Sequence, residues 1–175
     1  IILSNGYSTS PSSKATSLVD DFWISKDGGI SWARPQIATP FSGRYQHGLS
    51  FIKNKILIFG GRSTNIYKND VWSSNNYGVT WTEEKNANWR PSFAFATVSI
   101  NNKTIYTFGG FYSSIDLNDQ WSYNIDDTWK LEAANSVWSG RNTFSAIATK
   151  NGDQILLIGG RSQTTYFSDV WVYSS

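Results

Sequence analysis

The sequence contains no cysteine and a single histidine, His47. The lack of cysteine excludes disulfide bonds, thiolate metal ligands and thiol nucleophiles, and one histidine cannot form a multi-histidine metal site. We therefore expect no bound metal and no cofactor. His47 falls in register with two aromatic positions of the repeat described below, Phe93 and Phe144. This register predicts a core or channel-lining residue rather than a catalytic base.

The chain also lacks a strong excess of one charge and any long apolar run. The net charge is only +2 and no run of lysine or arginine occurs, so nothing provides an electrostatic track for a nucleic acid or an anionic membrane. No apolar stretch approaches the roughly 18 residues of a membrane span. The first residues, IILSNGYSTS, resemble neither a methionine start nor a signal peptide. We expect no nucleic-acid binding, no membrane insertion and a chain that is processed, trimmed or partial.

Aromatic residues, in contrast, make up 16% of the chain and recur in a pattern. The signature Asp-x-Trp occurs four times, with its tryptophans about fifty residues apart. The copies are Asp21/Trp23, Asp70/Trp72, Asp119/Trp121 and Asp169/Trp171. A unit of this length is typical of a small sheet that buries its faces only when neighbours stack on it. The period predicts an all-β fold, a β-propeller of four-stranded antiparallel blades, with about 3.5 to 4 blades in this chain.

Each unit has the same internal order. The expected first strands begin at Arg44, Arg90 and Arg141, and the second strands end at Gly60-Gly61, Gly109-Gly110 and Gly159-Gly160. The Asp-x-Trp segment is the third strand, and a later tryptophan, Trp32, Trp81 or Trp129, marks the fourth. We predict a single domain with blade units 1–43, 44–89, 90–140 and 141–175.

Two motifs in these units resemble known families. The double glycine, the Asp-x-Trp strand and the following tryptophan resemble kelch repeats over essentially the whole chain. Residues 25–32, SKDGGISW, also resemble the Asp-box of sialidases and related propellers, with Asp27 in the aspartate place. Residues 74–81 repeat this motif with Asn76, and residues 122–129 keep it in part. The resemblance implies a structural role, in which the Asp or Asn side chain accepts backbone N–H groups across a turn.

Strand direction alternates in an antiparallel blade, so two kinds of loop emerge on one face. The loops from the second to the third strand are residues 62–69, 111–118 and 161–168. The segments between blades are residues 33–43, 82–89 and 130–140. We call this the long-loop face and predict that it is the binding site, because loops on a rigid scaffold commonly carry recognition.

Two groups of side chains are candidate ligand-binding residues. Arg44, Arg90 and Arg141 would place three guanidiniums near the channel mouth, where they could hold a carboxylate or an acidic peptide. The alternative is that each arginine bonds backbone carbonyls as part of the repeat. The aromatic candidates are Phe41, Trp89 and Trp138 beside those arginines, and Tyr67, Tyr112 and Tyr166 in the long loops. Exposed aromatics would stack on sugars or anchor a protein, whereas buried ones would fill the groove between blades.

The kelch resemblance implies a non-enzymatic module that binds a protein partner or builds an assembly. The alternative is a carbohydrate-binding or sialidase-like propeller, although a sialidase also needs a tyrosine nucleophile paired with a carboxylate and a separate acid. The repeats do not single out such a set. Asn102 begins the one N-glycosylation sequon. The Asp-box motif and the asparagine-rich loops favour an extracellular setting.

The terminal units are incomplete as predicted. The first lacks its inner strand and the last its outer strand, so the ring does not close in the usual way, and exposed edges invite pairing. Either the chain is part of a longer propeller, or copies of it form a homo-oligomer or filament by edge-strand pairing.

Overall fold

The computed structural model describes residues 1–9, 16–35, 38–124 and 128–174. The regular elements of these residues are all β-strands. No helix long and apolar enough to cross a membrane occurs among them. The strands are β1 (Ile2–Thr9), β2 (Thr16–Ile24), β3 (Gly48–Ile52), β4 (Lys55–Phe59), β5 (Arg62–Ser63), β6 (Ile66–Tyr67), β7 (Val71–Ser74), β8 (Thr82–Glu83), β9 (Ala96–Ile100), β10 (Thr104–Tyr112), β11 (Ile115–Tyr123), β12 (Trp129–Ala133), β13 (Ser145–Ala148), β14 (Gln154–Ile158) and β15 (Val170–Ser174).

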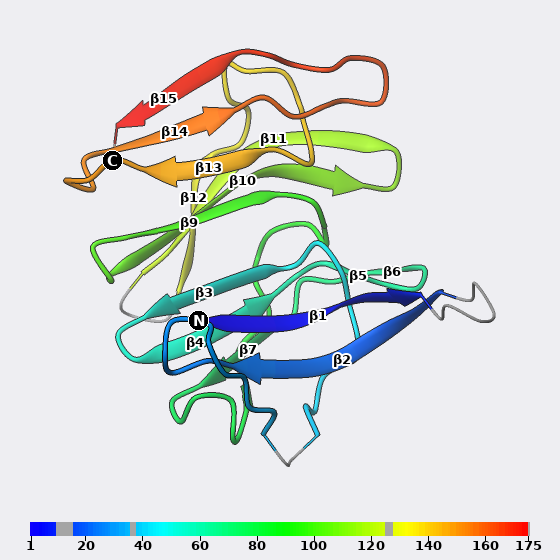
Figure 1. Cartoon of the computed structure of the whole chain (residues 1–175). Coiled ribbons are helices and arrows are strands. Elements are labelled where there is room, and N and C mark those ends of the chain that lie inside the picture. The colour runs from blue at the N-terminus through cyan, green and yellow to red at the C-terminus, as the bar shows by residue number, and fades with distance from the viewer. Residues whose placement is uncertain (10–15, 36–37, 125–127, 175) are drawn as a thin grey trace.

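Apart from the two-stranded β5–β6 hairpin, the strands form four antiparallel sheets that follow one another along the chain (Figure 1). The first sheet is β1-β2, the second β3-β4-β7-β8, the third β9-β10-β11-β12 and the fourth β13-β14-β15. The short β5–β6 hairpin lies in the loop between β4 and β7. The inner strand β9 contacts both β3 and β13, the inner strands of the neighbouring sheets. The sheets are therefore the blades of a partial β-propeller, which confirms the predicted fold class.

The fourth strands of the first two blades are shorter than their tryptophans predict. In the first blade the segment after Trp32 makes a single bridge, between Ile24 and Ala33. In the second blade β8 contains only Thr82–Glu83. An outermost strand has a hydrogen-bonded neighbour on one side only, so less of its backbone is held in the ladder.

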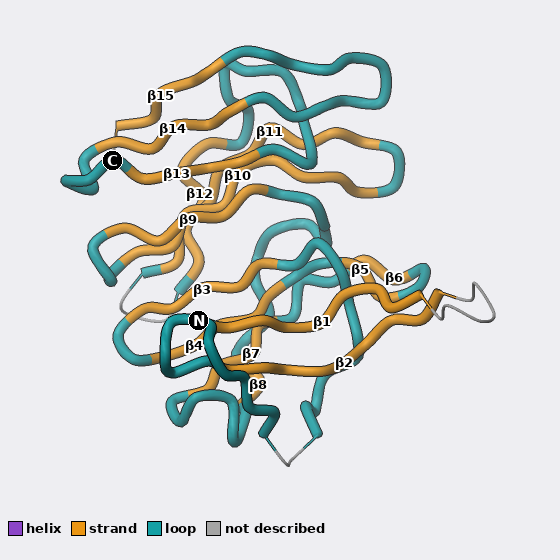
Figure 2. Tube along the Cα trace, viewed as in Figure 1, coloured by secondary structure: helices purple, strands orange, loops and turns teal. Residues whose placement is uncertain are grey.

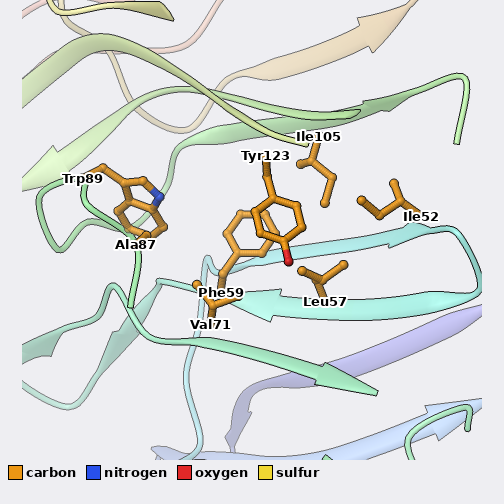
Figure 3. Packing of buried hydrophobic residues seen from close by; sticks show 8 residues of the cluster. All are labelled: Ile52, Leu57, Phe59, Val71, Ala87, Trp89, Ile105 and Tyr123. Carbon is orange, nitrogen blue, oxygen red and sulfur yellow. The ribbon is translucent and has the colours of Figure 1, made fainter. Parts of the chain in front are cut away.

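Apolar side chains fill the space between consecutive blades. In β4, alternate residues point to opposite faces. Ile56 and Ile58 pack towards Phe22 of the first blade, while Leu57 and Phe59 pack towards the third. Figure 3 shows the second of these cores, formed by Ile52, Leu57, Phe59, Val71, Ala87, Trp89, Ile105 and Tyr123. Burial on both faces explains why this strand is a continuous apolar run rather than an alternating one.

In each of the four blades, an equivalent local hydrogen bond joins the two side chains of the Asp-x-Trp signature. The tryptophan Nε1–H donates to the aspartate Oδ2 two residues earlier, which ties the two side chains together on the third strand. The bonds are Trp23 to Asp21 at 2.8 Å, Trp72 to Asp70 at 3.0 Å, Trp121 to Asp119 at 2.8 Å and Trp171 to Asp169 at 2.7 Å. The signature therefore has a structural cause that repeats with the fold.

The double glycine turns the second strand away from the sheet. Gly60 and Gly61 have φ values of 61° and 90°, and the pairs Gly109-Gly110 and Gly159-Gly160 have the same left-handed conformation. A Cβ atom on Gly61 would lie 2.6 Å from the Cβ of His47. Only glycine combines this backbone conformation with such close packing at low cost.

Within the described residues, the two ends of the stack are open. β1 is an edge of the first sheet, and β15 is an edge of the last. Figure 1 shows β15 at the top of the view, and β1 and β2 in the lower half, where they overlap strands of the second blade. The described residues therefore form an arc of blades rather than a closed ring.

Candidate ligand-binding face

The longer connections gather on one side of the blades. In Figure 2 the β5–β6 hairpin, the β10–β11 hairpin and the loop between β14 and β15 project to the right. The tight turns β3–β4, β9–β10 and β13–β14 lie on the left. Three segments of the predicted long-loop face, residues 62–69, 111–118 and 161–168, thus lie together at the end of the blades where the double glycines lie.

Arg44 and Arg141 are buried inside the blades rather than presented on this face. Arg44 is fully buried and makes a bidentate ion pair with Asp70, with both N–O distances at 2.7 Å. Arg141, 1% exposed, pairs in the same way with Asp169 at 2.5 and 2.8 Å. Each guanidinium also donates to the carbonyl of the first repeat glycine, at 3.0 and 2.9 Å. The predicted arc of ligand-binding arginines is therefore wrong at both positions, because the N–H groups of these guanidiniums already bond to a carboxylate and a glycine carbonyl of their own blade.

The third blade has a serine where its neighbours have these arginines. The start of each inner strand contains one non-glycine residue with positive φ, Gln46, Ala94 or Thr143, and this residue fixes the register between blades. Two positions earlier lie the buried arginines of the second and fourth blades, and Ser92 in the third. The prediction that Arg90 matches them is wrong, because it lies two residues too early.

The repeat carboxylate of the third blade consequently has no arginine partner. Asp119 accepts the Trp121 bond but makes no ion pair among the described residues. Burial raises the pKa of Asp119 above its usual value, although the Trp121 bond and the charge of Arg90 oppose the shift. The pKa of Asp70 is lowered instead, since its bonds to the buried arginine outweigh its burial. Arg90 is exposed, with its guanidinium carbon 5.7 Å from the ring centre of Tyr112.

The aromatic residues that precede the arginine positions are part of the core. Phe41, Trp89 and Trp138 are 4%, 5% and 3% exposed. Phe41 packs edge-on against Trp81 at 5.1 Å between ring centres, and Trp89 against Trp129 at 5.5 Å. The structure therefore selects the interpretation in which these rings fill the groove between blades, and their proposed role in binding is wrong.

The three tyrosines of the long loops lie in different environments. Tyr67 is half-buried and packs against Tyr112 at 5.1 Å and against Phe93 at 5.6 Å. Tyr166 is 84% exposed and forms a bridge with Arg161. Of the predicted aromatic candidates, Tyr166 is the one whose ring is fully presented on the long-loop face.

A pocket of about 310 Å³ opens on this face where three blades meet. Its walls are Gln46, Phe93, Phe111, Asn142, Thr143, Arg161, Ser162 and Gln163. Arg161 follows the double glycine of the fourth blade, and Arg62 takes the same position in the second. The guanidinium of Arg62 lies over Tyr67 and Phe93, 5.1 and 5.6 Å from the ring centres. Sequence reasoning missed these two arginines, although the triplet Gly-Gly-Arg occurs twice.

His47 is half-buried and packs against the second repeat glycine of its blade, Gly61. Its Nε2 lies 2.8 Å from the hydroxyl of Ser4. Burial, assisted by the charge of a neighbouring arginine, lowers its pKa to about 4. The corrected register aligns it with Phe95 and Phe144, not with Phe93. Among the residues that the structure describes, no group of three or more His, Asp and Glu side chains could hold a metal ion.

The Asp-box segments form side-chain-stabilised turns on the opposite face. Asp27 accepts the backbone N–H of Ser31 at 2.9 Å, and the bonds from Ser31 and Ser25 lower the pKa of Asp27 below its usual value. In the second blade Asn76 accepts the backbone N–H of Thr80 at 2.9 Å. The third segment includes residues 125–127, outside the described part of the chain. In each of the first two turns, one Asp or Asn side chain thus accepts a backbone N–H four residues later.

The glycosylation sequon also lies on that opposite face, in the turn between β9 and β10. Asn102 is exposed, and its Oδ1 accepts the backbone N–H of Lys53 at 2.8 Å. This bond joins the turns of neighbouring blades. Attachment of a glycan at Asn102 stays a prediction.

The comparison with known families agrees with this architecture. A family model described as the KLHDC2/KLHL20/DRC7 Kelch-repeats domain matches residues 2–175. The chain belongs to this kelch-repeat family. Kelch-repeat domains are generally non-enzymatic modules of protein interaction. No curated protein matches the chain, and the resemblance of its Asp-box turns to sialidases gains no support from the family match.

Proposed function

We propose that this kelch propeller binds an acidic segment of a partner protein in the central pocket of the long-loop face. The observation that carries the proposal is the position of Arg161 and Arg62, which follow the double glycines of two blades on either side of the third. Unlike the buried repeat arginines, neither makes an ion pair among the described residues. The exposed guanidinium of Arg161 lines the pocket and can pair with a carboxylate of a ligand. Arg62 is half-buried over Tyr67 and Phe93 and is not among the residues that line the pocket.

The surroundings of these arginines suit a peptide better than a small ion. Phe93 and Phe111 contribute aromatic walls that meet edge-on at 5.8 Å. Asn142 and Gln163 add side-chain amides that could bond to a peptide backbone. A pocket of about 310 Å³ is of the size that takes a few side chains rather than a folded surface.

A binding titration with a defined probe tests this proposal. Fluorescence anisotropy of a labelled oligo-glutamate peptide should show saturable binding that weakens as salt rises, because Arg161 is solvent-exposed. Arg161→Gln should weaken binding by at least about tenfold, since a hydrogen bond to a charged group contributes roughly 1.5–3 kcal/mol. Arg62→Gln should weaken binding less, because the Arg62 side chain is half-buried.

The matched control is Lys150→Gln, which removes one positive charge from an exposed residue in the tight turn between β13 and β14, away from the long-loop face. This variant should bind like the unmodified protein. Equal loss in all three variants would show that only net charge matters, and oligo-lysine binding as tight as oligo-glutamate would contradict the proposal.

The carbohydrate-binding alternative depended on exposed aromatic rings. Phe41, Trp89 and Trp138 are buried, and only Tyr166 among the predicted candidates is fully presented. One exposed ring provides little stacking area for a sugar. A protein ligand therefore agrees better with the long-loop face.

A second proposal concerns assembly through the open blades. Val170 and Val172 of β15 are 57% and 58% exposed, and Ile1, Leu49 and other apolar residues line an open groove of about 660 Å³ beside β1. Exposed edges with apolar faces favour pairing with a further strand. We infer that copies of the chain associate through these edges. Light scattering over a concentration series should then show a mass above the monomer, and a monomer at all concentrations would contradict the inference.

A further inference from the structure

Among the described residues, the first blade lacks an inner strand. In the other three blades the inner strand pairs with the second strand: β3 with β4, β9 with β10 and β13 with β14. β1 is the second strand of the first blade, because Leu3 pairs with Trp23 of the Asp-x-Trp strand as Ile58 of β4 does in the second blade. Within the described part of the chain, β1 pairs with β2 alone. Its other edge therefore presents unpaired backbone N–H and C=O groups where the neighbouring blades have a strand.

The groove of about 660 Å³ beside β1 lies where this strand would run. Its walls include Ile2 of β1 and Leu49 and Phe51 of β3. In the fourth blade, Ala146 and Ala148 take the places of these two β3 residues and pack against the third blade. Inner strands also contact one another across the blades, since β9 contacts both β3 and β13. An inner strand of the first blade would therefore lie in this groove, against Leu49 and Phe51.

A series of backbone hydrogen bonds between the blades also stops at this place. The N–H of Thr143 donates to the carbonyl of Ala94 at 2.8 Å, and the N–H of Ala94 donates to the carbonyl of Gln46 at 3.0 Å. These three are the positive-φ residues at the start of the inner strands. The N–H of Gln46 has no acceptor among the described residues. A peptide carbonyl on the first blade would continue the series.

The repeat carboxylate of the first blade, Asp21, lacks the partner that an inner strand delivers. In the second and fourth blades this partner is an arginine, Arg44 or Arg141, four residues before the inner strand begins. Asp21 accepts the hydrogen bond from Trp23 but makes no ion pair among the described residues. The third blade shows that an inner strand forms without this arginine, because Ser92 takes its place. We therefore expect an arginine to strengthen the binding of a strand without being required for it.

We propose that this groove binds an extended segment of a partner protein, which completes the first blade as its inner strand. The backbone of the segment pairs antiparallel with β1, and its alternate apolar side chains pack against Leu49 and Phe51. An arginine shortly before the paired residues reaches Asp21. The inner strands of a second copy are already paired within their own blades, so another protein supplies the segment. Because the groove is also one of the open edges of the assembly proposal, a bound segment excludes a second copy from it.

A peptide titration tests the site. The probe is labelled RYQHGLSFI, residues 44–52, which contain the inner strand of the second blade and the arginine before it. Fluorescence anisotropy should show saturable binding to the unmodified protein. Replacement of the peptide arginine by citrulline keeps the shape without the charge and should weaken binding by about tenfold. N-methylation of the backbone amides that face β1 should abolish binding, because the peptide then loses its donors to this strand.

Two variants of the protein locate the bound peptide. Phe51→Lys places a charge in the groove and should weaken binding by at least about tenfold. Asp21→Asn should weaken binding of the arginine peptide to the level of the citrulline peptide, whose own binding should not change. The matched control Ile147→Lys makes the same kind of change at an exposed apolar residue of β13, outside the groove, and should bind normally. Asp21→Asn alone decides the question if Phe51→Lys does not fold.

Equal binding of a scrambled or an N-methylated peptide would overturn the proposal, as would unchanged binding to Phe51→Lys. Self-association that Phe51→Lys abolishes and the peptide does not reverse would assign the groove to a second copy and contradict a partner segment. Unlabelled oligo-glutamate, the probe of the central pocket, should not displace the peptide, and displacement would contradict a separate site. Peptide binding by a chain that stays monomeric and does not bind oligo-glutamate would refute the two earlier proposals and support this one.

Discussion

The contrast between Asp70 and Asp119 gives a stability prediction that the structure makes unusually specific. Both carboxylates lie at the same place in the repeat and accept a bond from the tryptophan two residues later. Only Asp70 neutralises a fully buried arginine, Arg44. The same substitution, aspartate to asparagine, should therefore have very different effects in neighbouring blades.

Asp70→Asn leaves the Arg44 guanidinium buried without a counter-charge, with one amide oxygen in place of two carboxylate oxygens beside the two backbone carbonyls at 3.0 and 3.3 Å. Removal of one partner from a buried ion pair costs about 3–5 kcal/mol. Asp119→Asn removes a charge that burial already disfavours, so the free energy of unfolding should change by less than about 1 kcal/mol in either direction. A loss of 3–5 kcal/mol would be a large part of the roughly 5–15 kcal/mol that keeps a typical domain folded.

Urea unfolding followed by tryptophan fluorescence measures both variants against the unmodified protein. Arg44→Ser, which copies the natural Ser92, is the informative companion: combined with Asp70→Asn it should be less damaging than Asp70→Asn alone, because no unpaired guanidinium remains. Equal destabilisation by Asp70→Asn and Asp119→Asn would refute the reasoning that the third blade differs from its neighbours.

Three further predictions concern other parts of the fold. His47→Phe, which copies the aromatic residue of the other blades, should make the free energy of unfolding less dependent on pH. Because the pKa of His47 is lowered to about 4, the stability from its neutral form is present above pH 6.5 and is lost as the pH falls toward 4. Urea unfolding of the unmodified protein should show a loss of roughly 2 kcal/mol by pH 5. The Arg141 bonds lower the pKa of Asp169 to about 2, so the stability from this ion pair should be present above pH 3.8 and lost on acidification toward pH 2. Thermal melts over this pH range measure the loss, which should be absent in Asp169→Asn. Gly78→Ala should cost about 2 kcal/mol or more in the same unfolding assay, because φ is +79° and the new Cβ would lie 2.4 Å from the ring of Phe22.

The architecture could be predicted from the sequence because its causes are local. Each Asp-x-Trp signature reports a hydrogen bond within one strand, and each double glycine reports a turn with positive φ. These features recur wherever the blade recurs, so their period reveals the fold. Incomplete fourth strands were not predictable, since tryptophan marks a position in the blade without fixing how many ladder bonds form around it.

The candidate site was harder to predict because it depends on contacts between distant residues. The alignment of Arg90 with the buried arginines failed since the residue type matched while the spacing did not. Arg44 and Arg141 follow their aromatic neighbours Phe41 and Trp138 by three residues, whereas Arg90 follows Trp89 directly. That spacing was the available signal. Whether an arginine is buried or presented depends on a partner carboxylate, such as Asp70, from another strand of the blade.

Hydrogen exchange of the protein with and without bound oligo-glutamate tests the central functional claim most directly. Binding in the central pocket predicts slowed exchange of backbone amides in residues 62–69 and 161–168, with the tight-turn face unchanged. Arg161→Gln should remove this protection at the same peptide concentration. Protection confined to the turns at residues 25–32 and 74–81 would show that the ligand binds the opposite face and would contradict the account.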